Sequence, residues 1–309
     1  MFYMFCMHPK KQNILRCDTM KLITYYDEFF NNSYNRDLRI IGNLTPKKPI
    51  RHTPKLKSTN EKHAKQKRIF IRNNINSRNA RYNAFYGWHT YFKDLKDYLK
   101  ANENKRIINH FFFDFDKEFD ATTKFKKITK GDGKDNLGIK DLEKLPTKEY
   151  IDGMNEIQEK IQDMILFENI LLDSWNESKK VYEYFKSQGL RTYTCLSMSK
   201  GVHLRCFFNP IHVANYNMII HNLHDNLVKQ FNLKTLDPKV SGKDSNPLKS
   251  VERLPYTFNE KSGLRVIPFN FEHDSLDDVI EKSLLLSKSK INRVDEFNLS
   301  DYFNQTFHD

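Results

Sequence analysis

Apolar residues fall into short runs whose spacing alternates between that of strands and that of helices. Residues 106–116 (RIINHFFFDFD) form an apolar run of the length of a buried strand. Residues 190–208 predict a strand, a tight turn at Gly201 and a second strand, and residues 264–269 predict a further strand. Because strands and helices alternate, the pattern indicates a mixed class, α/β or α+β.

Helical spacing occurs in four other segments. Residues 88–101 (WHTYFKDLKDYLKA) place aromatic and leucine side chains one helical turn apart, so we expect a helix there. Residues 147–188, 213–231 and 276–286 predict three further helical segments. Residues 120–147 are rich in Lys, Gly and Asp, and this composition predicts a loop or a small insertion.

Positive charge is concentrated in the N-terminal quarter of the chain. Residues 1–85 hold 18 Lys and Arg against 5 Asp and Glu, whereas the remaining residues hold 33 against 34. Residues 46–68 contain three prolines, nine basic residues and one acid, without periodicity, which predicts a disordered basic linker. We therefore expect a basic, largely disordered arm over residues 1–68. Such an arm suits a polyanion, although a solubilising tail would have the same composition.

The sequence also excludes some classes of protein. No apolar run approaches the roughly 20 residues that a membrane-spanning helix needs, and Met1–Lys10 lacks the features of a signal peptide. These features predict a soluble, cytoplasmic protein that does not bind membranes. The cysteines Cys6, Cys17, Cys195 and Cys206 include no C-x-x-C pair, so no structural zinc is expected. Cys195 and Cys206 could face each other across a hairpin, but free thiols are expected in a reducing compartment.

Two acids end the apolar strand at a spacing that places them on one face. Asp114 and Asp116 are separated by one residue, and residues i and i+2 of a strand point the same way. Two like charges that close are unfavourable unless a cation lies between them. Mg²⁺ and Mn²⁺ prefer carboxylate oxygens, and pairs of such ions serve polymerases. A strand that simply ends in solvent would carry the same two acids.

The turn after the next strand gathers groups that can bind phosphate. Ser197, Ser199, Lys200 and His203 surround Gly201, and each can donate hydrogen bonds to phosphate oxygens. Gly201 permits a tight turn and a close approach of the backbone to a ligand. The segment lacks the spacing of a P-loop. An ordinary Lys-Gly hairpin with a packed histidine is the alternative.

A third region, from Asp237 to Phe269, adds one acid and several bases. Asp237 could supply a third carboxylate to a metal pair, and Arg253, Lys261 and Arg265 could contact phosphates. A surface loop with solvated charges would contain the same residues.

In this order, the three segments resemble the three motifs of the archaeo-eukaryotic primase superfamily: a strand with two acids, a turn with Ser, a basic residue, Gly and His, and a strand with one Asp. The third region is similar to the small catalytic primase subunit. There the Asp is followed by a basic residue and a Pro and then by a K-[ST]-G segment. Here Arg253-Leu254-Pro255 and Lys261-Ser262-Gly263 follow Asp237. The resemblance covers about residues 70–270.

The resemblance implies a role for each matching residue. It implies that Mg²⁺ or Mn²⁺, as a two-ion site, is bound by the catalytic carboxylates of Asp114, Asp116 and Asp237. It also implies that the incoming triphosphate is bound by Ser197, Ser199, Lys200, His203, Arg253, Asn259 and Lys261. One position departs from the pattern, since Asn259 stands where eukaryotic relatives have a histidine. Asparagine can still donate a hydrogen bond but carries no charge.

The implied protein is a DNA primase or primase-polymerase. Such an enzyme synthesises short primers on single-stranded DNA by two-metal nucleotidyl transfer from NTPs or dNTPs. The implied fold is α+β, an RRM-like catalytic sheet with flanking helices plus a smaller N-terminal α/β unit. The catalytic domain would span residues 69–272 and a helical tail residues 273–309. A separate helicase or large primase subunit is an expected partner, because no Walker motif is present.

Other interpretations remain open. Residues 78–86 contain aromatic and basic side chains that could line a template groove or, equally, pack in a core: Arg78, Arg81, Tyr82, Phe85 and Tyr86. A rolling-circle nuclease would need an H-x-H pair, which the sequence lacks. His221 and His224 lie one helical turn apart without an evident third zinc ligand. A non-catalytic, single-strand DNA-binding accessory protein is the main alternative to an enzyme.

Overall fold

The computed structural model describes sixteen strands and helices together with a number of connecting residues. The described residues are 36–45, 48–52, 83–92, 103–116, 124–131, 137–142, 144–243, 245, 251–253, 255 and 257–288.

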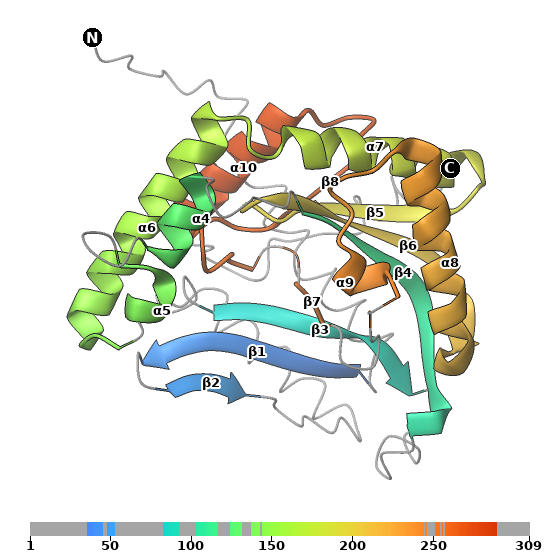
Figure 1. The fold of residues 1–309 in the computed structure, drawn as a ribbon, viewed down its shortest axis with the longest axis horizontal. Helices are drawn as coiled ribbons and strands as arrows, with labels where there is room; N and C mark the ends of the chain where they lie inside the picture. The colour runs from blue at the N-terminus through green and yellow to red at the C-terminus, as the bar shows by residue number, and fades with distance from the viewer. Residues whose placement is uncertain are drawn as a thin grey trace, which may run out of the picture.

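The described strands form one antiparallel sheet in the order β2-β1-β3-β4-β6-β5-β8, and β7 pairs with β3 (Figure 1). The strands are β1 (Arg36–Thr45), β2 (Lys48–His52), β3 (Asn83–Phe92), β4 (Arg106–Asp116), β5 (Arg191–Leu196), β6 (Gly201–His212), β7 (Val251–Arg253) and β8 (Ile267–Phe269). The helices are η2 (Glu103–Lys105), α4 (Lys124–Lys130), α5 (Ile139–Leu142), α6 (Thr147–Phe167), α7 (Leu172–Ser187), α8 (Val213–Phe231), α9 (Pro238–Ser241) and α10 (Leu276–Lys288). The mixed class expected from the alternation of elements is therefore confirmed, and the antiparallel sheet makes it α+β.

The two faces of β4 have different environments. Alternate residues of β4 point towards helices α7 and α8, which pack on β4 and β6 (Figure 1). Phe113 lies 5.6 Å from the ring of Phe185 in α7, and Phe111 lies 5.8 Å from Tyr216 in α8. Because side chains alternate along a strand, Asp114 and Asp116 project from the opposite face. The aromatic core beneath thus fixes which way the two acids point.

A second group of helices supports the loop that follows β7. Helix α6 lies beside α4 and α5 at one side of the molecule (Figure 1). Gln158 donates to the carbonyl oxygen of Glu260 at 3.1 Å, and Gln162 donates to that of Ser262 at 2.7 Å. The loop is therefore tied to α6 by side-chain amides. No helix among the described residues combines the length and apolar character that crossing a membrane requires.

One expectation about local structure was wrong, and the structure refines two others. Residues 88–92 belong to strand β3, because their aromatic residues suit a strand as well as a helix and pairing with β1 decides between the two. The segment 120–147 contains helices α4 and α5, whose apolar residues Phe125 and Leu142 are buried against α6. The expected helix over residues 147–188 is divided between α6 and α7, and Asn169 adopts a positive φ of 49° between them.

Two strands lie within the N-terminal arm. Strands β1 and β2 lie within residues 1–68 and pair with each other, and β1 continues the sheet through β3. Strand β2 falls in the segment 46–68 that was expected to be a disordered linker, so that expectation is wrong for Lys48–His52, because long-range pairing outweighs local composition. The largely disordered character of the arm as a whole stays a prediction. The other residues of the arm and of the 289–309 tail lie outside the described part of the chain.

The predicted hairpin forms, but it does not bring the two cysteines face to face. The register pairs Cys195 with His203 and Cys206 with Thr192. Both thiols are free and buried, as expected, and burial raises the pKa of Cys206 to about 12. Cys6 and Cys17 lie outside the described residues.

Candidate active site

The three carboxylates predicted from the sequence lie at one end of β4. Asp114 and Asp116 project from the face opposite to α7 and α8. The backbone N–H of Asp237 donates to the carbonyl oxygen of Asp114 at 2.8 Å, and that of Asp116 donates to Thr235 at 2.7 Å. Leu236 forms an antiparallel bridge with Phe115. Strand-like pairing thus brings Asp237 beside the two acids across more than a hundred residues of sequence.

Strand β6 brings the phosphate-binding candidates to the same place. In the β4–β6 register, Asp114 is opposite His203 and Asp116 is opposite Gly201. A cavity of about 190 Å³ opens here. Its lining consists of Phe112, Val240 and nine predicted site residues, namely Asp114, Asp116, Ser197, Ser199, Lys200, His203, Arg253, Asn259 and Lys261. Asp237, the tenth, stands at the N-cap of α9, three residues before Val240.

Asp114 is buried close to two other acids. Burial raises its pKa well above the usual range, and the nearby charges of Asp116 and Asp237 raise it further, against the opposing effect of Lys200 and Arg253. Its Oδ1 atom is buried and accepts no hydrogen bond. The nearest base, His203, places Nε2 at 3.7 Å from this oxygen, which is beyond hydrogen-bonding distance. The site therefore holds negative charge that its own side chains leave incompletely compensated.

Lys200 supplies the positive charge closest to the acids. Its ammonium lies 2.5 Å from Asp116 Oδ2. Burial lowers the pKa of Lys200, but the charges of Asp116, Asp114 and Asp237 outweigh burial, so its pKa is raised overall. Lys200 is thus held in its charged form at the edge of the cavity.

The turn that carries Lys200 is tightly built. Ser197 N–H donates to the carbonyl oxygen of Gly201 at 2.9 Å, and Gly201 N–H donates to Ser197 Oγ at 3.1 Å. Met198 is buried with a φ of 56°, a conformation that non-glycine residues rarely adopt. A Cβ atom on residue 201 would overlap the Phe115 carbonyl oxygen and the Asp116 carboxylate. Only glycine lets the turn lie directly against the acids.

The loop after β7 locks onto this turn. Asn259 donates through Nδ2 to the carbonyl oxygen of Ser197 at 2.8 Å, and its Oδ1 accepts from the Lys261 N–H at 3.0 Å. Arg253 binds both carboxylate oxygens of Glu260, at 2.5 and 3.2 Å. Burial raises the pKa of Glu260, but the Arg253 charge and hydrogen bond lower it overall. Asn259 therefore joins two parts of the site, and Arg253 lines the cavity while anchored to a carboxylate.

The acids can be tested for their fit to divalent ions. Among the described residues, no three His, Cys, Asp or Glu side chains form a compact metal-binding group. Asp116 faces Lys200, and Asp237 Oδ1 accepts from the Lys239 N–H at 2.8 Å. The uncompensated Oδ1 of Asp114 nevertheless marks a place for positive charge. Carboxylate oxygens are the donors that Mg²⁺ and Mn²⁺ prefer, so the chemistry of the acids suits such ions, whereas their positions in the described structure do not form a compact metal site.

Sequence reasoning missed a residue that holds Asp237 in place. Glu177 of α7 accepts hydrogen bonds at 2.8 Å from the Lys234 N–H, the Thr235 N–H and the Thr235 hydroxyl. Thr235 in turn accepts from the Asp116 N–H at 2.7 Å. Glu177 thereby fixes the segment that leads into Asp237. Nothing in its helical sequence context distinguishes it from a solvated surface acid.

The histidine pair on α8 contacts the segment that follows Asp237. His224 Nδ1 lies 2.8 Å from Ser241 Oγ, and His221 Nε2 lies 3.0 Å from Ser245 Oγ. Burial lowers the pKa of His224. Both imidazoles are thus engaged with serines, and no third zinc ligand joins them among the residues that the structure describes.

The proposed template residues are only partly described. Arg78, Arg81 and Tyr82 lie outside the described residues, whereas Phe85 and Tyr86 lie in β3, where Tyr86 pairs with Arg253 of β7. This backbone pairing places β3 next to the cavity. A scan against protein-family models and a search of curated proteins found no match for this chain.

Proposed function

We propose that this chain is a primase or primase-polymerase of the archaeo-eukaryotic type, which joins NTPs or dNTPs on a single-stranded DNA template. The observation that carries the proposal is the convergence of three distant segments on one cavity. Acids from β4 and from residue 237 meet a hydroxyl- and base-rich turn that is paired directly opposite them. A nucleotidyltransferase needs this combination, because its acids hold cations and its bases hold the triphosphate.

The chain order of the central elements supports an RRM-like sheet. Strand β4, helix α7, strands β5 and β6, helix α8 and Leu236 occur in the chain order β-α-β-β-α-β, with helices α4, α5 and α6 inserted between β4 and α7. Phe115 pairs with Val202 on one edge of β4, so its bridge to Leu236 lies on the other edge. Under this proposal, β1, β2 and β3 belong to the smaller N-terminal unit.

The carboxylates of Asp114, Asp116 and Asp237 would hold the two divalent ions. Ions bound there would activate the attacking 3′-hydroxyl group and stabilise the leaving pyrophosphate. The work of the chain itself is to orient the acids, and Phe113 and Phe115 do so by their burial against the helices.

Under this proposal, Lys200 pairs with Asp116 in the nucleotide-free protein and with the triphosphate once a nucleotide is bound. Without nucleotide it neutralises Asp116, and with a triphosphate in the cavity its ammonium moves to the phosphate oxygens. Ser197, Ser199 and His203 add hydrogen-bond donors on the same side of the cavity. The basic N-terminal residues are proposed to bind the template backbone, and a separate helicase or large primase subunit to assist the chain.

The direct test is primer synthesis on unprimed single-stranded DNA, with Mg²⁺ or Mn²⁺ and either NTPs or dNTPs. We expect metal-dependent products from the wild type and none from Asp114→Asn. Extension of an annealed primer without initiation would identify a polymerase that needs a partner to start. Loss of both activities with DNA binding intact would contradict the proposal and favour an accessory single-strand-binding protein.

A further inference from the structure

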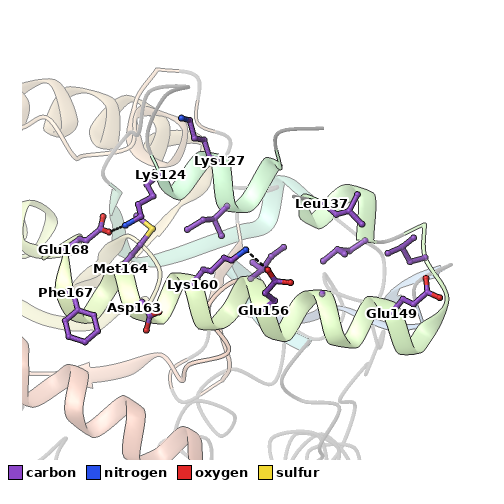
Figure 2. A pocket seen from close by; sticks show the side chains of 15 residues that line it. Lys124, Lys127, Leu137, Glu149, Glu156, Lys160, Asp163, Met164, Phe167 and Glu168 are labelled. Atoms are coloured by element: carbon purple, nitrogen blue, oxygen red, sulfur yellow. Dashed lines mark hydrogen bonds and ion pairs between the residues drawn. The ribbon is translucent and has the colours of Figure 1, made fainter. Parts of the chain in front are cut away.

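A second cavity lies away from the candidate active site, along helix α6. It has a volume of about 730 Å³ and runs between α6 on one side and α4 and α5 on the other (Figure 2). Its floor is apolar and is formed by Ile128, Leu142, Leu145, Ile157 and Met164. We call this feature the α6 groove.

One end of the α6 groove carries an unusual exposed aromatic residue. Phe167, the last residue of α6, is 80% exposed and borders the groove together with Met164 (Figure 2). Leu137, which borders the groove on the side of α5, is 47% exposed. Apolar surface that lines a concavity in this way is typical of a protein-binding site.

The wall formed by α6 repeats every seven residues. Glu149, Glu156 and Asp163 form an acidic row, and Gly153, Lys160 and Phe167 form a second row beside it. A seven-residue repeat keeps side chains on almost the same face of a helix. The acidic row extends for about 21 Å at 1.5 Å per residue. In a coiled coil, charged residues at this spacing flank the apolar seam between two helices.

The opposite wall carries the opposite charge. Helix α4 (KFKKITK) contains four lysines and no acid, and Lys124 and Lys127 border the groove. Two ion pairs bridge groove residues, Lys124 with Glu168 and Lys160 with Glu156, and their side chains are well exposed. Exposed pairs of this kind contribute little to stability, so an incoming charged partner can displace them readily.

We propose that the α6 groove binds an amphipathic helix of a partner protein. The apolar stripe of that helix lies on the groove floor and against Phe167. Basic residues on one flank face the acidic row of α6, and acidic residues on the other flank face the lysines of α4. A helix fits better than nucleic acid because the acidic row repels phosphate. The proposal is independent of the chemistry at the active site.

The test uses the full-length protein and two labelled synthetic peptides of about 18 residues, or five helical turns. Both peptides carry the same leucine stripe. The first has lysines on one flank and glutamates on the other, and the second has glutamates on both flanks. Fluorescence anisotropy measures the affinity of each peptide. We expect the first peptide to bind the wild type about 10-fold more tightly than the second, because charge juxtaposition sets specificity.

Charge reversal on α6 provides the decisive comparison. In the double variant Glu149→Lys/Asp163→Lys both walls become basic, so the preference should reverse in favour of the second peptide. Glu159→Lys, on α6 but outside the groove lining, should leave the wild-type preference unchanged. Phe167→Ser should weaken both peptides without lowering the melting temperature, since Phe167 is exposed. The same variants should retain wild-type primer synthesis.

Three results would overturn the proposal. One is that neither peptide binds, and another is that both bind equally well. The third is that the preference survives charge reversal. If the double variant changes affinity for single-stranded DNA instead, the groove belongs to a nucleic-acid path and not to a helix-binding site.

Discussion

The active-site cavity and the α6 groove differ in how their charges are arranged. The groove is the larger, at about 730 Å³ against about 190 Å³, but its charged side chains form exposed pairs around an apolar floor. In the smaller cavity, Asp114 is buried beside Asp116 and Asp237, and its pKa is raised as a result. Buried like charges are costly and persist mainly where function uses them. Electrostatic conflict, not volume, therefore distinguishes the candidate catalytic centre.

The two regions also differ in how tightly their backbones are constrained. The active-site turn contains a non-glycine residue with positive φ, Met198, and a glycine that touches Phe115 and Asp116. The α6 groove is built on helices and meets its neighbours mainly through side chains. We therefore expect substitutions in the cavity to affect activity and those in the groove to affect association.

The largest effect is expected for Asp114→Asn. It should reduce nucleotide incorporation on the order of 10³-fold or more, yet raise the melting temperature without metal. A carboxyl whose folded pKa is raised destabilises the fold once it ionises, and asparagine removes that charge.

Enzyme assays and thermal unfolding of the same preparations measure both effects. The matched control is Asp163→Asn in the α6 groove, which should change neither quantity. If Asp114→Asn lowered the melting temperature and kept activity, the contrast between the two regions would be wrong.

A smaller effect is expected for Glu177→Gln. Glutamine can keep its carbonyl oxygen where Oε2 accepts the three bonds of 2.8 Å, but its amide then faces the Lys234 N–H, which lies 3.1 Å from Oε1, and the negative charge is lost. The segment before Asp237 therefore loosens. Residues that orient metal ligands typically account for about 10–100-fold in activity or affinity. Titration of Mn²⁺ during primer extension should show the loss as a higher Mn²⁺ concentration needed for half-maximal activity. Glu183→Gln, at an exposed position of the same helix, should behave as the wild type. An equal loss there would contradict the role of Glu177 in holding the segment before Asp237.

Two glycines provide the next comparison. Gly201→Ala should destabilise the protein by about 1–3 kcal/mol, because its Cβ meets a backbone carbonyl and the Asp116 carboxylate. Gly153→Ala in α6 should cost less, since its Cβ meets the Leu142 side chain and no backbone atom and alanine favours a helix. Chemical denaturation gives both free energies of unfolding. Equal effects would show that the turn is less tightly packed than the structure indicates.

The smallest effect is a pH dependence confined to the active site. Metal binding requires Asp114 to be ionised, so affinity for Mg²⁺ should rise with pH through the raised pKa of Asp114. Over the same window, from the usual aspartate pKa up to the raised value, stability without metal should fall as pH rises. Asp114→Asn should remove this slope in stability. Peptide binding to the α6 groove should change little over that window, and a parallel change in both would point to a global pH effect.

The sequence predicted some features well because their signals are local. The apolar run of residues 106–116 matches β4, and the helix over residues 213–231 matches α8. The convergence of the acids with the Ser197–His203 turn followed from the order of motifs. Sequence could not predict the role of Glu177 or the joining of Asn259 to Ser197, because both depend on tertiary contacts. The helix predicted from residue 88 was wrong for residues 88–92, because pairing with β1 decides between strand and helix where the sequence pattern suits both.

The central claim is that Asp114, Asp116 and Asp237 hold divalent ions for nucleotidyl transfer. The most direct measurement is the stoichiometry of bound Mn²⁺, determined by electron paramagnetic resonance with a non-hydrolysable nucleoside triphosphate present. The account predicts two ions per chain in the wild type and a loss of binding in Asp114→Asn, with Asp163→Asn unchanged. If Asp114→Asn bound as many ions as the wild type, with the same affinity, the assignment of the metal site would be contradicted.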